Sequence, residues 1–145
     1  MGLFKVSDEK SNESYELIKR IFEQAAPGED CRLVYGYSMK SGFMSKKIGS
    51  FILGLSSDEQ TLQILPFDVV EQTPGSLITI NRSEITSAKR SMQGATVIES
   101  PKLAKKLKVV IPPFTAKGAD NTYQLPINQE ENEKIFRDFF TTIKK

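Results

Sequence analysis

A run of phenylalanines near the C-terminus places the strongest constraint on how this chain can fold. From residue 128 onward, the apolar side chains recur at the spacing of one helical face: Ile135, Phe136, Phe139, Phe140 and Ile143. Asn128 followed three residues later by Glu131 matches a capping box, and Lys144 and Lys145 suit the negative end of the helix dipole. The pattern predicts a helix beginning after Asn128 that covers a large apolar surface.

A second amphipathic helix is predicted over residues 12–26. Its apolar side chains form one stripe: Leu17, Ile18, Ile21, Phe22 and Ala25. Ser11 is placed to cap its first turn, and Pro27 and Gly28 end it. This stripe also needs a surface to pack against.

Between the two helices the apolar period changes to two. From Cys31 to Met39 the odd-numbered residues are apolar or aromatic and alternate with Arg32, Val34, Gly36 and Ser38, which predicts a strand with one buried face. Turn residues separate further strand-like stretches, of which the third and fourth could form one bent strand: 48–56, 61–67, 77–80, 85–90, 96–98, 107–111 and 122–127. A helix, about seven short strands and a closing helix predict a single α+β domain.

Composition excludes several classes of chemistry. The 145 residues include no histidine and one cysteine, Cys31. Ser-His-Asp and Cys-His catalysis, histidine-rich zinc sites, intramolecular disulfides and cysteine-clustered metal sites all need residues that the chain lacks. We therefore expect a non-enzymatic protein without a metal or another cofactor. The net charge of +2 also argues against nucleic acid as a partner.

No targeting or membrane segment is expected. The first residues contain no apolar stretch typical of a signal peptide, and the apolar run over residues 51–55 is too short to cross a bilayer. We therefore expect a cytoplasmic protein with a reduced thiol.

Four stretches of the chain follow one another in a recognisable order: the hairpin 51–65, the piece 80–90, the strand 106–111, and residues 122–127 leading into the helix 128–144. Together they resemble a pleckstrin-homology (PH) domain, most closely the bacterial PH-like domains and their GRAM-type relatives. The resemblance implies an antiparallel seven-stranded barrel or sandwich over residues 31–145, capped by the C-terminal helix, with residues 1–30 as an added helical extension. The chain lacks the tryptophan usual in the terminal helix of eukaryotic PH domains, and Phe139 takes that place.

The same resemblance implies binding rather than catalysis. We expect a non-enzymatic binding or scaffold domain of a bacterial cytoplasm that acts through protein–protein contacts or self-association. Open strand edges attract another chain unless they are covered, and the stripe of the helix over 12–26 must pack somewhere. These two arguments predict a homo-oligomer, with a different protein as the other partner class.

The alternative function is weak binding of an anionic lipid, or of another anion, through the first hairpin loop. Lys40, Lys46 and Lys47 lie in that loop beside Phe43 and Met44, where PH domains hold lipid head groups. Lysines attract an anionic surface while an apolar pair can enter the interface. The other interpretation is a solvated loop whose lysines keep the protein soluble.

A second basic run comprises four lysines: Lys102, Lys105, Lys106 and Lys108. It makes the strand region basic, while the segments before and after it are acidic. An anionic partner would fit this run. Neutralisation by acidic residues within the fold or within an oligomer is the alternative.

Overall fold

The computed structural model describes residues 7–39, 48–69, 71–91, 94–114 and 125–143. These residues form an α+β fold with antiparallel strands between two α-helices, as the sequence predicts. The elements in chain order are α1 (Asp8–Ala25), β1 (Cys31–Met39), β2 (Ile48–Ser56), β3 (Thr61–Asp68), β4 (Thr73–Pro74), β5 (Ile78–Asn81), the 3-10 helix η1 (Arg82–Glu84), β6 (Ser87–Arg90), β7 (Thr96–Glu99), β8 (Leu107–Val109) and α2 (Glu130–Ile143).

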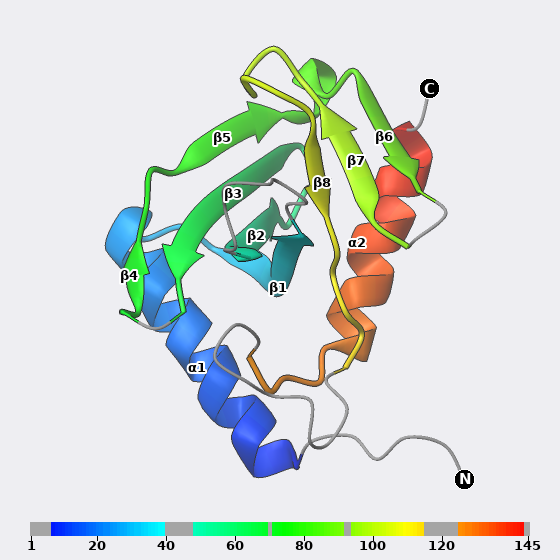
Figure 1. Cartoon of the computed structure of the whole chain (residues 1–145). Coiled ribbons are helices and arrows are strands. Elements are labelled where there is room, and N and C mark those ends of the chain that lie inside the picture. Colours follow the sequence, from blue (N-terminus) through cyan, green and yellow to red (C-terminus); the bar gives the residue numbers. More distant parts are fainter. Residues whose placement is uncertain (1–6, 40–47, 70, 92–93, 115–124, 144–145) are drawn as a thin grey trace, which may run out of the picture.

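The strands form two antiparallel sheets (Figure 1). In the larger sheet β1, β2 and β3 are neighbours, and both β4 and β5 pair with β3. The smaller sheet has the order β6-β7-β8. One antiparallel bridge joins the sheets, where the N–H of Tyr37 donates to the carbonyl of Val110 (2.9 Å) and the N–H of Val110 donates back (2.7 Å).

The expected barrel is wrong, because within the described residues the outer strands β5 and β6 do not pair with each other. The 3-10 helix η1 separates these two strands and turns the chain from one sheet to the other. The strand assignment also differs from the expected seven. The described part of the chain has eight strands, one of them only two residues long, and residues 125–127 run without strand pairing.

The space between the two sheets holds the first apolar core, and α2 packs on it. Phe136, Phe139 and Phe140 are at most 4% exposed, which confirms that the C-terminal helix covers a large apolar surface. The strand residues of this core come from both sheets: Val34, Leu53, Leu55, Leu62, Ile64, Ile80, Ala88, Ile98 and Val109.

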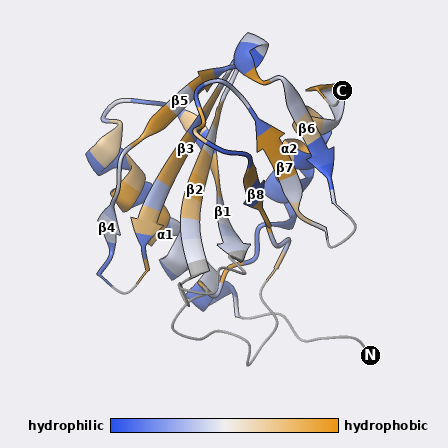
Figure 2. Cartoon of the chain, turned by 45° about the horizontal axis from the view of Figure 1, so that its top comes forward, coloured by the Kyte–Doolittle hydropathy of each residue, from blue (hydrophilic) through white to orange (hydrophobic). Residues whose placement is uncertain are grey.

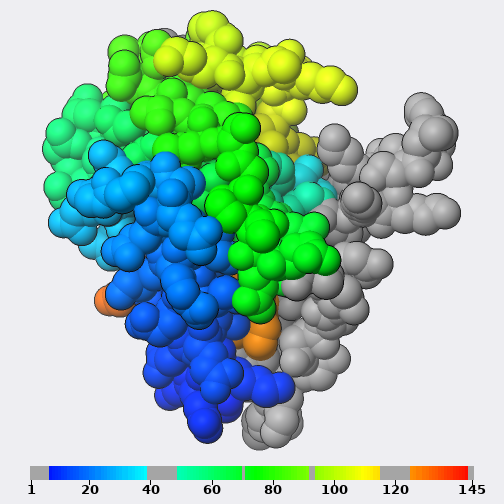
Figure 3. Space-filling model, turned by 90° about the vertical axis from the view of Figure 1, so that its left-hand side faces the viewer, coloured from blue at the N-terminus to red at the C-terminus, as the bar shows by residue number. Residues whose placement is uncertain are grey.

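A second apolar core lies on the opposite face of the larger sheet, beneath α1. Ile18, Ile21 and Phe22 of the α1 stripe pack against strand residues such as Leu33 and Leu65. Figure 3 shows α1 lying across this face with the segment around β4 beside it. The stripe therefore has its partner within the chain.

The prediction that β1 has one buried face is wrong, because both of its faces are covered. Val34, Gly36 and Ser38, expected on the solvent side, are buried. One face of β1 packs toward α2 and the other toward α1. Figure 2 shows apolar stretches in orange on β2 and β3, and stretches with apolar residues on both faces are typical of strands that are buried on both sides.

Both helices begin at other residues than expected. Helix α1 begins at Asp8, with Ser7 as the N-cap that accepts from the N–H of Lys10 (3.2 Å). Ser11 instead lies inside the helix, where its hydroxyl oxygen accepts from the N–H of Asn128 (2.8 Å). Helix α2 begins at Glu130, so Asn128 does not occupy its N-cap position. A side chain that bonds to a residue 117 positions away leaves no signal in a local sequence pattern.

Candidate functional site

On the outer edge of β1, which faces away from β2, the backbone groups have hydrogen-bond partners along only part of the strand. The backbone N–H of Tyr35 donates to the side-chain oxygen of Gln129 (2.9 Å), and the Gln129 amide nitrogen donates to the Tyr35 carbonyl (2.8 Å). Further along, Tyr37 pairs with Val110. Because backbone groups alternate in direction along a strand, the odd-numbered residues of β1 all direct their N–H and carbonyl groups away from β2. Leu33 and Cys31 therefore direct theirs to the same outer edge.

Asn132 of α2 covers the next part of this edge incompletely. Its side-chain nitrogen donates to the carbonyl of Leu33 (3.3 Å), and its oxygen accepts from a guanidinium nitrogen of Arg32 (2.9 Å). Among the described residues, no group accepts a hydrogen bond from the N–H of Leu33. None bonds to the backbone N–H or carbonyl of Cys31 either. The first three residues of β1 thus form an open strand edge.

A cleft of about 470 Å³ lies at this open edge. Its walls come from α1, from α2, from the start of β1 and from the turn between β2 and β3. The lining residues are Tyr15, Asp30, Cys31, Arg32, Leu55, Ser56, Ser57, Glu59, Asn132 and Ile135. We call this hollow the β1-edge cleft. It combines unpaired main-chain groups with apolar surface and polar side chains from both helices.

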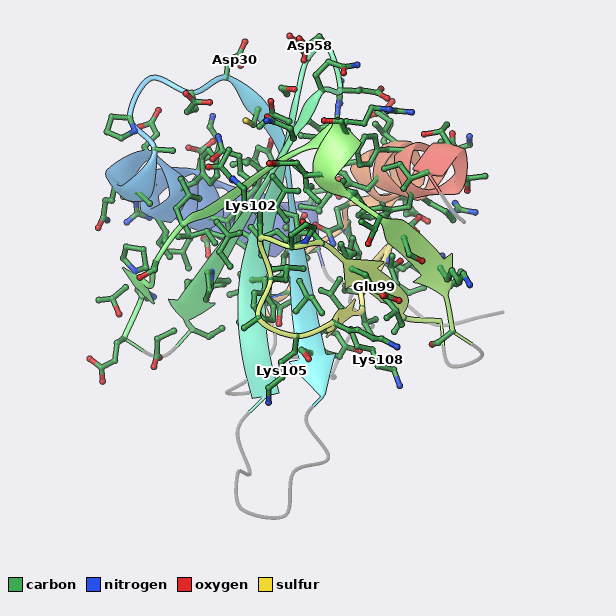
Figure 4. The ribbon with its side chains drawn as sticks, turned by 90° about the horizontal axis from the view of Figure 1, so that it is seen from above. Asp30, Asp58, Glu99, Lys102, Lys105 and Lys108 are labelled. Atoms are coloured by element: carbon green, nitrogen blue, oxygen red, sulfur yellow. The ribbon has the colours of Figure 1, made fainter. Side chains whose placement is uncertain are left out.

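The end of the molecule around the β1-edge cleft is acidic. Asp30 and Glu59 line it, and Figure 4 shows Asp30 and Asp58 at the same end of the fold. The Asp58 carboxylate accepts from the Ser56 hydroxyl (2.7 Å) and from the N–H of Gln60 (3.1 Å). These hydrogen bonds, the one from Ser56 first, lower the pKa of Asp58 below its ordinary value. Asp58 therefore keeps its negative charge in mildly acidic solution.

The thiol in the β1-edge cleft is not activated. Burial raises the pKa of Cys31, a hydrogen bond with Gln63 opposes this, and the charges of Glu29 and Asp30 raise it further. A cysteine is a good nucleophile only as the thiolate, so Cys31 is mostly an unreactive thiol at neutral pH. The site therefore fits binding better than covalent chemistry.

The predicted anion-binding residues Lys40, Lys46 and Lys47 lie outside the described residues, as do Phe43 and Met44.

The second basic run is partly neutralised within the fold. Lys102 pairs with Glu84 (3.7 Å) and Lys106 with Glu99 (3.9 Å). Figure 4 shows Lys105 and Lys108 well away from Asp30 and Asp58. Lys105 and Lys108 therefore lie apart from the acidic end at the β1-edge cleft.

The strand register places part of this run beside the first hairpin. Because Tyr37 is opposite Val110 and the strands are antiparallel, Lys108 is level with Met39, the last residue of β1. Lys108 is also in register with Val97 and Lys89 across the small sheet, on the face away from the core. Lys89, Lys105, Lys106 and Lys108 are all exposed, and we call the surface that they form the basic face.

The sequence did not single out Gln129 and Asn132, the two residues that shape the β1 edge. Gln129 lies within the predicted capping box, whose pattern was assigned to Asn128 and Glu131, and Asn132 follows it directly. In a sequence, a side-chain amide at the start of a helix is interpreted as a local N-cap. Its use as a partner for a strand almost a hundred residues earlier depends on tertiary structure alone.

Comparison with protein-family models, with curated proteins and with solved structures gives no match to this chain. Neither helix of the described residues has the length and apolar character needed to span a membrane. Within the same residues, no three cysteine or carboxylate side chains gather in a way that could hold a metal ion.

Proposed function

We propose that this chain is a non-enzymatic binding domain of PH-like layout, and that it receives an extended segment of a partner protein at the β1-edge cleft. The PH-like layout is supported by the order of its parts: an antiparallel sheet, a second three-stranded sheet, and a C-terminal helix packed on the core between them. The proposed site is carried by one observation, the open strand edge at Cys31 and Leu33 beside a cleft.

An unpaired strand edge recognises an extended chain through its backbone. The added segment exchanges main-chain hydrogen bonds with the edge, and pockets beside the edge select among its side chains. At the β1-edge cleft, Cys31 offers both of its backbone groups, and the N–H of Leu33 follows on the same strand edge. Tyr15 and Ile135 provide apolar contact next to them. The cleft is thus suited to a short strand rather than to a helix.

Charge selects the chemistry of the partner segment. Asp30 and Glu59 line the β1-edge cleft together with one cation, Arg32, so its lining carries one net negative charge. Asp58 at the same end of the fold adds another. A segment that carries Lys or Arg complements this surface, and like-charged acidic segments are disfavoured. We therefore propose a basic, extended protein segment as the occupant.

The experiment is selection of peptides from a displayed library of random twelve-residue sequences on the immobilised full chain. We expect peptides enriched in Lys and Arg that slow the alkylation of Cys31 by iodoacetamide. Ser57→Trp should weaken their binding at least tenfold, because Ser57 is exposed, lines the cleft and can be enlarged without disturbing the core. Asp30→Lys should weaken binding of the basic peptides by a similar factor.

Matched controls are Ser83→Trp and Glu71→Lys, which enlarge a serine and reverse an acidic charge at exposed positions that do not line the β1-edge cleft. Both should bind the selected peptides as the wild type does. Peptides that bind Ser57→Trp unchanged and leave Cys31 equally reactive would overturn the proposed site. Light scattering at twice the chain mass, lost in Ser57→Trp, would identify a second copy as the occupant.

A second candidate function, contact with an anionic surface, is supported by the register of β1 and β8. It brings Lys108 level with Met39, which directly precedes Lys40 in the sequence. Each lysine near an anionic membrane surface adds about 1 kcal/mol, and this contribution fades within a Debye length. Such binding would be weak and sensitive to salt.

Co-sedimentation with phosphatidylserine vesicles tests this second function. We expect binding of the wild type at low salt and its loss at high salt. Lys46→Glu/Lys47→Glu and, separately, Lys105→Glu/Lys108→Glu should each reduce the bound fraction. A wild-type chain that stays in the supernatant at low salt would exclude the membrane as a partner.

A further inference from the structure

A groove between α2 and the β6–β7 hairpin contains two arginines. Arg90, at the end of β6, and Arg137, on α2, both line it, together with Thr96 of β7. Its volume is about 190 Å³, and a smaller hollow that shares these three residues adjoins it. Phe140 lines both hollows. This groove lies apart from the β1-edge cleft and shares no lining residue with it.

Within the described part of the chain, the guanidinium of Arg90 has no partner. Among the described residues no hydrogen bond or ion pair involves its side chain. The guanidinium lies close to Gly94: a Cβ atom added to Gly94 would be 3.9 Å from a terminal nitrogen of Arg90. A guanidinium carries five N–H donors in a fixed plane. Arg90 therefore presents a full set of donors at the mouth of the groove.

Arg137 is held in place by a buried acid. Its terminal nitrogen lies 3.3 Å from a carboxylate oxygen of Glu133, whose side chain is only 8% exposed. This pair restricts the guanidinium to one side of the groove and leaves its other donors available. With Arg90, Arg137 and Glu133 counted together, the groove keeps one net positive charge.

The arrangement of donors favours phosphate over carboxylate. Arg90, Thr96 and Arg137 come from three different elements, so their donors approach the groove from more than one direction. The hydroxyl of Thr96 makes no hydrogen bond within the described part of the chain. A planar carboxylate matches the fork of one arginine, whereas a tetrahedral phosphate group offers three acceptor oxygens in different directions.

We propose that Arg90, Arg137 and Thr96 form a binding site for a phosphate group. Arg90 supplies the free guanidinium, Arg137 a second one that Glu133 orients, and Thr96 a hydroxyl donor. The ring of Phe140 limits access of water beneath the bound group. The group arrives either as a free phosphate compound or on a phosphorylated side chain, and the two sources share this chemistry.

The test is a titration of the isotope-labelled full chain followed by amide chemical shifts at constant ionic strength. The probes are inorganic phosphate, phosphoserine blocked at both ends, and acetate. We expect saturable shifts at Ala88, Thr96 and Thr141 with phosphate, and at least tenfold weaker binding of acetate. Tighter binding of blocked phosphoserine than of phosphate would identify a phosphorylated protein as the source, and the reverse would identify a free compound.

The decisive variant is Arg90→Gln, and its matched control is Lys89→Gln. Both remove one positive charge from exposed positions of β6, but Lys89 lies on the opposite face of the sheet. Arg90→Gln should weaken phosphate binding at least tenfold, while Lys89→Gln should change it less than twofold. Arg137→Lys keeps the charge beside Glu133 and should give an intermediate loss. Equal losses in Arg90→Gln and Lys89→Gln, or shifts that never saturate, would overturn the proposal.

Discussion

The side chain of Gln129 makes the two backbone hydrogen bonds to Tyr35 that a neighbouring strand would make. Its oxygen accepts from the Tyr35 N–H (2.9 Å) and its nitrogen donates to the Tyr35 carbonyl (2.8 Å), as a strand backbone would. The same nitrogen donates to the carbonyl of Pro112 (2.8 Å). One buried amide thus joins the start of α2, the middle of β1 and the segment after β8.

Replacing Gln129 by alanine should destabilise the fold strongly. The change leaves buried backbone groups of Tyr35 without partners, and each unsatisfied buried group costs about 1–3 kcal/mol. We expect a loss of about 2–4 kcal/mol in the free energy of unfolding, measured by denaturant titration. Gln24→Ala, at an exposed position of α1, is the control and should stay within about 0.5 kcal/mol. A loss equally small for Gln129→Ala would show that water replaces the amide.

Stability should fall steeply in alkaline solution because of Tyr35. Burial raises the pKa of Tyr35 from 10.0 to about 12, against the effect of hydrogen bonds with Ser50 and with the backbone of Leu125. The folded chain therefore holds this proton to higher pH than the unfolded chain. The stabilisation is complete below pH 10 and is lost as the pH rises toward 12, a change of about 2–3 kcal/mol.

The comparison that isolates this residue is Tyr35→Phe. Lysines titrate in the same range, so denaturant midpoints are needed for both proteins from pH 8 to about pH 11.5. At pH 8 the variant should be less stable than the wild type, because it lacks the hydrogen bonds of the Tyr35 hydroxyl. Between pH 10 and pH 11.5 its free energy of unfolding should fall less than that of the wild type. Parallel curves for the two proteins would contradict the assignment to Tyr35.

Phe139→Ala should cost about 3–5 kcal/mol, because this ring is almost fully buried between α2 and the strands. The Arg82 guanidinium also lies over the ring, 5.2 Å from its centroid, and loses this contact. Thermal and denaturant unfolding both measure the loss. Glu131→Ala, on the exposed side of the same helix, should change little. Equal midpoints for these two variants would mean that α2 is not docked on the core.

Gly36→Ala should destabilise the corner where β1 meets β8. An added Cβ would lie 2.8 Å from a methyl carbon of Val109 and 3.2 Å from the Val110 carbonyl oxygen. Such overpacking costs about 1–3 kcal/mol. Gly49→Ala in β2 is the matched control, since its nearest contact would be 3.4 Å, and its stability should be unchanged or slightly raised. A fully stable Gly36→Ala would show that the two sheets can separate there at little cost.

The α+β class, the α2 core face and most strand positions follow from local periodicity. Apolar side chains at helical or alternating spacing identify an element, as they do for Phe136, Phe139 and Phe140. Periodicity does not show whether one face or both faces of a strand are covered by other elements. Val34 was assigned to solvent because Leu33 and Tyr35 occupied the other face, yet a second covering layer buries it.

The candidate sites depended on tertiary structure throughout. The β1-edge cleft owes its shape to Asn132 and Gln129, which bond to residues about a hundred positions earlier. Arg90 and Arg137 lie on different elements, β6 and α2, and neither belongs to a basic run. The lysines chosen from sequence formed such runs, which describe composition but do not locate donors around one ligand.

The partners of α1 come from the strands that follow it and from residues 125–128 far along the chain, and this bears on the order of assembly during synthesis. Ser11 bonds to Asn128, and Ile127 and Leu125 belong to the core beneath the helix. A growing chain therefore carries the finished helix for more than a hundred residues before its last contacts exist. Contacts this distant in sequence form slowly, because a long loop must close first. The nascent chain consequently exposes the part of the apolar α1 face that Leu125 and Ile127 later cover, and chaperones can bind there until these residues have been made.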